Sequence, residues 1–142
     1  MSLFTCLRAA APLLAMSLIA CGQTAPAATP QTIETGQDQA GSTIQARVGD
    51  TVRIKLVEKF PVPGSSLVWD VSSSAPEVLK RDKVTRDPAE RPRVGEVAYT
   101  ADFKAVAAGQ AKLIASGSAT CEAMAKPGCP NQDFTIVVKV SP

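Results

Sequence analysis

The sequence predicts an all-β fold, an immunoglobulin-like antiparallel β-sandwich of about seven strands. Short segments in which apolar and polar residues alternate with a period of two recur throughout residues 43–142. Gly, Pro, Ser and Asp separate these segments at nearly regular spacing. No window of ten or more residues after residue 20 has the 3.6-residue period of an amphipathic helix. A small, partly closed β-barrel is the alternative arrangement.

The first predicted strands flank a turn at residues 49–50. Residues 51–57 alternate apolar and charged side chains, which places Val52, Ile54 and Leu56 on a buried face. Residues 44–48, ahead of the turn, supply an edge strand.

Prolines and glycine break the chain at 61–66, and β-branched and aromatic residues resume at 67–71 as a third strand. Trp69 in this strand is interpreted as a core residue, and the alternative is an aromatic anchor at a partner surface. A short fourth strand is predicted at 77–80, followed by a polar loop over 80–93 that two prolines interrupt.

The last three predicted strands have the clearest alternation. They cover residues 97–103, 111–115 and 134–140, with a turn at 109–110 before the second. The final segment carries four large apolar residues on one face, which are Phe134, Ile136, Val138 and Val140.

The amino-terminal segment ends in Leu18, Ile19, Ala20 and Cys21 after an apolar run that follows Arg8. That run of about a dozen residues is shorter than the roughly 20 residues that a membrane-spanning helix needs. The segment resembles a bacterial lipoprotein signal peptide. The resemblance implies cleavage before Cys21, acylation of its thiol with fatty acids such as palmitate, and export.

Residues 1–20 are therefore expected to be a signal peptide, residues 21–42 a disordered tether rich in Ala, Thr, Pro, Gln and Gly, and residues 43–142 the folded domain. No Asp follows Cys21, so retention in an inner membrane is not signalled. The expected location is the cell envelope, lipid-anchored and extracytoplasmic, on the outer membrane of a diderm or the cell membrane of a monoderm.

Charge and residue content exclude several functions. Residues 21–142 contain 14 basic and 13 acidic residues, a balance that argues against nucleic-acid binding. The sequence has no histidine, which removes the usual general base and the Ser-His-Asp and Cys-His arrangements. We therefore expect that the protein is not an enzyme and that it uses no cofactor or metal.

Two cysteines lie between the last two predicted strands, Cys121 and Cys129. In an exported chain whose Cys21 carries lipid they are the remaining thiols, so a disulfide between them is expected. A metal site would need further ligands that the composition does not favour.

The segment 80–93 carries six basic and three acidic residues. One interpretation is a solvated loop. The other is contact with an anionic partner through Arg91 and Arg93, which charge reversal or added salt would weaken.

The order of features resembles the chagasin-type cysteine protease inhibitors over most of residues 44–140. The resemblance rests on a strand after Val48, Gly49 and Asp50, a Pro/Gly-rich loop that leads to Trp69, a long strand after Gly95, and a Phe-x-Val-x-Val-type last strand. In that family, three loops at one end of an immunoglobulin-like sandwich enter the cleft of a papain-like protease.

The loop motifs of that family are only partly present. The first loop keeps Gly64 and Trp69, the second keeps Gly95, and the third motif, Arg-Pro-Trp, is replaced by the 121–129 loop. The resemblance and the loops together predict these partner-binding candidates: Pro63, Gly64, Ser65, Arg91, Arg93, Gly95, Met124 and Lys126.

The predicted function is that of a lipid-anchored binding domain of the cell envelope whose partner is a protein. Loops carry recognition in such a domain, because a rigid sandwich presents them at low ordering cost. The most concrete form of the function, which the resemblance implies, is inhibition of a papain-type cysteine protease. The alternative is a non-catalytic accessory or assembly subunit of an envelope complex. The partner captured from solubilised membranes would distinguish the two functions. A soluble protease favours inhibition, and a stoichiometric membrane partner favours the assembly role.

Overall fold

The computed structural model describes residues 28–61, 63–121 and 131–142. Eight strands and one short 3-10 helix form this part of the chain, with no α-helix. The strands are β1 (Thr32–Gly36), β2 (Thr43–Arg47), β3 (Thr51–Phe60), β4 (Ser66–Ser73), β5 (Leu79–Asp87), β6 (Gly95–Ala105), β7 (Gly109–Thr120) and β8 (Gln132–Ser141), and the 3-10 helix is η1 (Gln37–Gln39).

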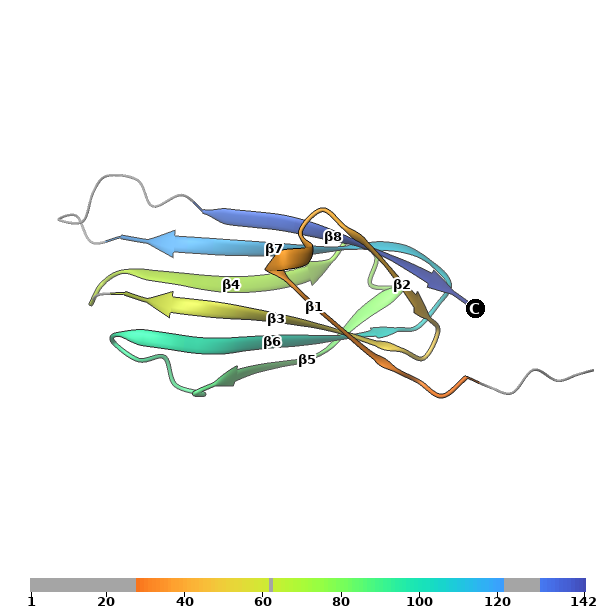
Figure 1. The fold of residues 1–142 in the computed structure, drawn as a ribbon, viewed down its shortest axis with the longest axis horizontal. Coiled ribbons are helices and arrows are strands. Elements are labelled where there is room, and N and C mark those ends of the chain that lie inside the picture. Colours follow the sequence, from red (N-terminus) through yellow and green to blue (C-terminus); the bar gives the residue numbers. More distant parts are fainter. Residues whose placement is uncertain (1–27, 62, 122–130) are drawn as a thin grey trace, which may run out of the picture.

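The strands form an open sheet in the order β2-β8-β7-β4-β3-β6-β5, while β1 pairs with β3 off this path (Figure 1). The sheet has one weak seam. β3 and β4 share only the pair Lys59 and Leu67, whereas β3 and β6 share ten pairs and β4 and β7 share eight. The seam separates two halves, β1-β3-β6-β5 and β2-β8-β7-β4.

One hydrophobic core joins the two halves. Alternate residues of β3, β6, β7 and β8 point inward, as the period-two pattern requires. Tyr99 and Phe103 from one half and Leu113 and Ile136 from the other are fully buried in the same cluster. The all-β, immunoglobulin-like prediction is therefore confirmed. The end strands β2 and β5 are not paired with each other, so the described sheet is open and not a barrel.

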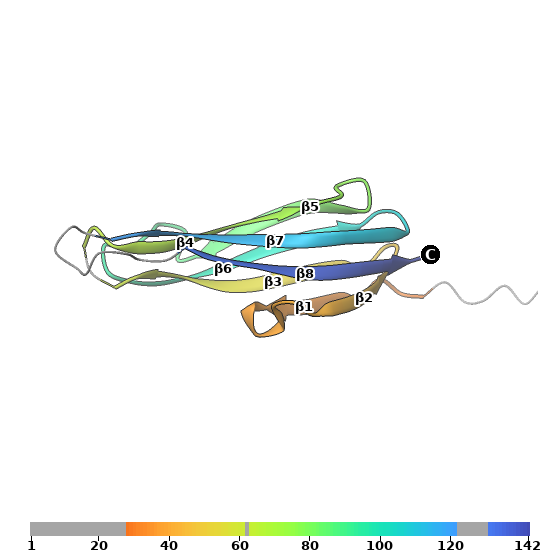
Figure 2. The same ribbon diagram turned by 90° about the horizontal axis from the view of Figure 1, so that it is seen from above.

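The folded region begins earlier than the sequence predicts. Residues 21–42 are expected to be a tether, but β1 pairs in parallel with β3 from Thr32 to Gly36, and η1 follows it. The chain then crosses to the other half, where β2 pairs in parallel with β8. Figure 2 shows β1 and β2 on the side opposite β5. The amino-terminal segment thus bridges the two halves, and the tether expected from the sequence is too long.

The fourth strand also differs from the prediction. The sequence places a strand at 77–80 and a loop at 80–93, but β5 continues to Asp87 and pairs with β6, with a bulge between Arg81 and Lys83. Charged side chains and bulges are usual on edge strands, because they discourage pairing with another chain. Only residues 88–94 connect β5 to β6.

Candidate functional site

The strand ends that flank three connections lie at one end of the fold, which we call the loop end (Figure 1). The connections are β3–β4, β5–β6 and β7–β8, and residues 122–130 of the last lie outside the described residues. Strand register places the flanking strand ends side by side, because Phe60 pairs with Gly95, Ser66 with Thr120 and Gly117 with Gln132. All three segments that carry the sequence-predicted contact residues therefore leave the fold at the same end.

The β3–β4 connection covers residues 61–65, of which Val62 lies outside the described residues. Pro63 and Gly64 are exposed, whereas Ser65 is buried. Gly64 has a φ of 85°, a left-handed conformation that L side chains rarely adopt. Two of the three predicted contact residues in this loop are therefore accessible to a partner.

The β5–β6 connection carries the exposed candidates Arg91 and Arg93. Gly95 starts β6 with a φ of 136°, and a Cβ there would lie 3.4 Å from Cγ of Pro92. Val94 is 53% exposed, the highest value among the exposed large hydrophobic residues that the structure describes. The loop thus carries an exposed apolar residue directly after an exposed cationic one in the sequence.

The β7–β8 connection begins at Cys121, directly after β7. Cys129, Met124 and Lys126 lie outside the described residues, as does Cys21. The disulfide, the acylation and these two contact residues stay predictions.

Glu58 is a functional candidate that the sequence reasoning missed. Its side chain is fully buried on the inward face of β3. Oε1 accepts a 3.3 Å hydrogen bond from the Trp69 backbone N–H, and both oxygens accept from Arg86 Nε at 3.2 and 3.3 Å. Arg91 donates from Nε at 3.2 Å and from Nη2 at 3.4 Å. One buried carboxylate therefore connects two strands and the β5–β6 loop.

Burial alone would raise the pKa of Glu58, because it disfavours the charged form. Hydrogen bonds from Arg91, the Trp69 backbone and Arg86 act in the opposite direction and outweigh it. The pKa of Glu58 consequently lies below its ordinary value of 4.5, so the carboxylate is charged at neutral pH.

Trp69 lies in the core, which confirms the interpretation made from the sequence. Its indole N–H donates a 2.9 Å hydrogen bond to the Val57 carbonyl, and its ring meets Phe134 edge-on at 5.6 Å between centroids. Gly117 leaves room for the ring, since a Cβ at that position would lie 2.8 Å from it. The second interpretation, a surface anchor, does not hold for so buried a side chain.

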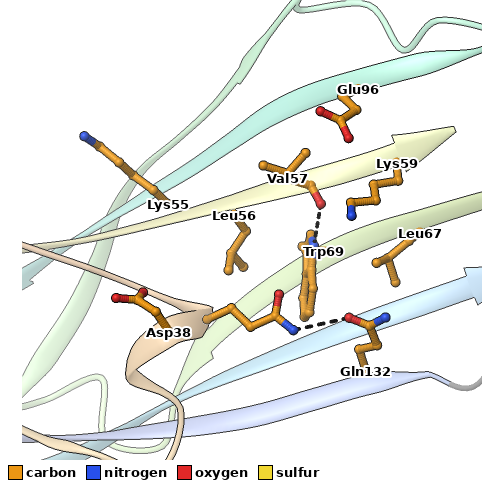
Figure 3. A pocket seen from close by; sticks show the side chains of 10 residues that line it. Asp38, Lys55, Leu56, Val57, Lys59, Leu67, Trp69, Glu96 and Gln132 are labelled. Atoms are coloured by element: carbon orange, nitrogen blue, oxygen red, sulfur yellow. Dashed lines mark hydrogen bonds between the residues drawn. The ribbon is translucent and has the colours of Figure 1, made fainter.

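A pocket of about 380 Å³ opens beside Trp69, where η1 lies near the β3–β4 seam (Figure 3). Gln37 donates to Gln132 across it at 3.3 Å. Lysines, acids and apolar side chains share its wall: Asp38, Lys55, Leu56, Val57, Lys59, Leu67, Trp69 and Glu96. This mixed lining has no cluster of catalytic groups.

Part of the basic segment is engaged within the protein. Arg81 donates to the Val71 carbonyl and forms an ion pair with Asp70 at 3.2 Å. Arg86 lies over the Tyr99 ring, 5.0 Å from its centroid, in addition to its contact with Glu58. Among the basic residues of the loop itself, Arg91 contacts Glu58, while Arg93 is exposed.

Two kinds of site are absent from the described residues. No group of three or more His, Cys, Asp or Glu side chains is placed to hold a metal ion there. None of the helices in that part of the chain has the length and apolar character needed to cross a membrane.

Comparison with known proteins shows likeness at the level of fold. No protein-family model matches the sequence, and no curated protein matches it significantly. The crystal structure of the cysteine protease inhibitor EhICP2 from Entamoeba histolytica matches 81% of this chain and all of its own, with a TM-score of 0.59 and 15% identity. The solution structure of Amebosin matches 79% of this chain and 99% of its own, with a TM-score of 0.53 and 20% identity. The chain thus shares its immunoglobulin-like fold with these two proteins.

Proposed function

We propose that this chain is a non-catalytic protein-binding module that inhibits a papain-type cysteine protease through its loop end. The observation that carries the proposal is that the strand ends flanking three connections lie at one end of a fold that a cysteine protease inhibitor shares. The partner class comes from the name of that structural neighbour and from the loop resemblance in the sequence.

The physical character of the loop end supports protein binding. The connections leave strands that long ladders hold in register, so the loop ends are fixed before a partner arrives. A fixed loop loses less conformational entropy on binding than a free one. Exposed Val94 next to Arg93 gives an apolar contact with a neighbouring cation, and residues of both kinds occur in protein interfaces.

The proposed membrane attachment through Cys21 is compatible with a free loop end. The described chain enters the fold at the opposite end, where the Thr51 N–H donates to the Gln31 carbonyl and the Gln31 N–H donates to Asp50. Nine residues lie between Cys21 and Gln31, a reach of at most roughly 35 Å. Acylation at Cys21 would therefore allow the loops to face away from the bilayer.

Inhibition of papain by the full chain, purified in detergent, tests the proposed function. We expect wild-type protein to inhibit in the nanomolar range and Val94→Asp to raise the inhibition constant at least tenfold, because a charge replaces an apolar contact. Val106→Asp is the matched control, since Val106 is 44% exposed and lies at the opposite end, between β6 and β7.

Two results would contradict this proposal. One is the absence of inhibition at micromolar protein. The other is an equal loss of inhibition in both valine variants, which would show that the loop end is not the contact surface. Stoichiometric capture of a membrane protein, with no effect on papain, would instead assign the accessory or assembly role.

The anchor has a separate test. Labelling of cells with a palmitate analogue should mark the wild-type chain, and Cys21→Ser should abolish the label and release the protein from the membrane fraction. A Cys121→Ser variant, labelled as strongly as wild type, is the control for cysteine specificity.

A further inference from the structure

The Glu58 carboxylate joins the core to one loop of the loop end. It sits on the inward face of β3 and is fully buried, two residues before the strand ends. A buried carboxylate is costly unless partners compensate its lost hydration. Here two arginines and one backbone N–H do so.

The two arginines are fixed in different ways. Arg86 belongs to β5, where it is paired with Tyr99 of β6 in the strand ladder, and its guanidinium lies over the Tyr99 ring. Arg91 belongs to the β5–β6 connection, outside the strand ladder. Strand pairing holds Arg86 in place without Glu58, whereas the contact with Glu58 ties Arg91, and with it the middle of the loop, to the core.

The same carboxylate is close to a second loop. Its Oε1 accepts from the backbone N–H of Trp69, and Trp69 follows the residue pair Lys59 and Leu67 that closes the β3–β4 connection. One side chain thus contacts elements on both sides of the seam and the β5–β6 loop.

We infer that Glu58 is a positioning residue that holds the β5–β6 loop, through Arg91, in the conformation presented to a partner. Glu58 itself is buried and cannot touch the partner. Its effect on binding passes through Arg91 and lowers the ordering cost of the neighbouring Arg93 and Val94. This role deepens the proposed function. Its effect on binding, the binding arm, rests on that function, whereas its effect on the conformation of the loop, the conformational arm, does not depend on it.

NMR order parameters of the backbone amides in the full chain test the conformational arm. In Glu58→Gln, the order parameters of residues 89–91, 93 and 94 should fall from about 0.85 to below about 0.6, while those of β7 and β8 stay unchanged. Asp102→Asn is the matched control. Asp102 of β6 also accepts two hydrogen bonds from an arginine, at 2.8 and 2.9 Å, but that arginine, Arg53, lies in strand β3 and not in a loop. It should leave the loop amides unchanged.

A second variant guards against a failure to fold. Arg91→Gln removes the same tie from the loop side, while Glu58 keeps Arg86 and the Trp69 N–H as partners. Because the Arg91 side chain is 46% exposed, its loss should not prevent folding. It should lower the order parameters of the same loop amides. Unchanged loop order parameters in Arg91→Gln, or in a folded Glu58→Gln, would overturn the inference.

A double-mutant cycle on the inhibition constant tests the binding arm. If Glu58 acts through Arg91, the variant with both substitutions should inhibit no worse than Arg91→Gln alone. Additive losses would overturn the positioning role, because they would mean that the two residues act separately. If wild-type protein inhibits no protease but the loop order parameters change as expected, the proposed function fails and the positioning of the loop stands.

Discussion

Strand β3 is paired very differently along its two edges. Along β6 it forms ten residue pairs, whereas its other edge forms five pairs with β1 and only one with β4. The β6 side is a continuous backbone ladder, so its outward side chains matter little to the pairing. On the other edge the ladder is interrupted between the β1 pairs, which end at Lys55, and the single β4 pair at Lys59, so side chains must supply the missing hydrogen bonds there. The polar groups of greatest structural consequence therefore gather where the ladder ends.

At the seam, a side chain of each strand forms a hydrogen bond with a backbone group of the other strand. The Val57 carbonyl of β3 accepts from the Trp69 indole, and the Trp69 backbone N–H of β4 donates to the Glu58 side chain of β3. Further along β4, the Val71 carbonyl accepts from Arg81 of β5. Loss of one of these side chains leaves a backbone group without its hydrogen-bond partner. In the β3–β6 ladder the backbone groups bond to each other, so loss of an outward side chain leaves none of them unpaired.

The largest effect should come from Trp69→Ala. This change removes the largest side chain at the seam and the donor to Val57, and should lower the free energy of unfolding by about 3–5 kcal/mol. Urea denaturation followed by circular dichroism measures it. A loss below about 1 kcal/mol would mean that the seam does not depend on this ring.

Gly117→Ala tests how closely the ring is packed. The added Cβ would lie 2.6 Å from the Gln132 carbonyl and 2.8 Å from the Trp69 ring, so we expect a loss of about 2–3 kcal/mol. Because Trp69→Ala opens this space, the double variant should lose less than the sum of the single changes. Additive losses in the same denaturation experiment would contradict the packing described.

The pH dependence of stability should depend on Glu58. Its folded pKa is lowered, so charged Glu58 contributes stability above its ordinary pKa of 4.5, and this contribution disappears as the pH falls through the folded pKa. Glu58→Gln should cost about 2 kcal/mol at pH 7. The difference from wild type should shrink below pH 4.5. Denaturation at a series of pH values checks this, and a constant difference down to acid pH would contradict it.

Asp102→Asn should have the smallest effect. Its pair with Arg53 bridges β6 and β3 on the outer face, where Arg53 remains 37% exposed, so the loss should be about 0.2–1 kcal/mol. The comparison with Glu58→Gln is direct, because both changes remove one charge paired with arginine. Equal losses in the two variants would show that the seam and the ladder do not differ as described.

The sequence predicts the elements whose inward residues are apolar. β6, β7 and β8 alternate without interruption, and the structure places strands over all three predicted segments. The apolar alternation predicts β3 only to residue 57, although Glu58 and Phe60 lie on the same inward face as Val52, Ile54 and Leu56. An inward charge in such a series is a signal of a buried ion pair, and it would have pointed to Glu58.

Two strands have no such signal. Of the inward residues of β5, Arg81 and Arg86 are charged, and the bulge shifts the period between Arg81 and Lys83. β1 contains one large apolar residue, Ile33, and depends on pairing with β3. Both strands exist because of distant partners, which local periodicity does not encode. The convergence of the three loops likewise follows from strand order and register.

β1 also has a mechanical consequence. It enters from the end opposite the loops and runs parallel to β3 over five residue pairs. If a lipid holds the amino terminus while a partner pulls on the loops, the tension acts along β1, and its rungs bear the load together in shear. A strand pulled at right angles would instead peel open one rung at a time. Part of the segment that the sequence predicts to be a disordered tether would thus resist the applied force as a paired strand.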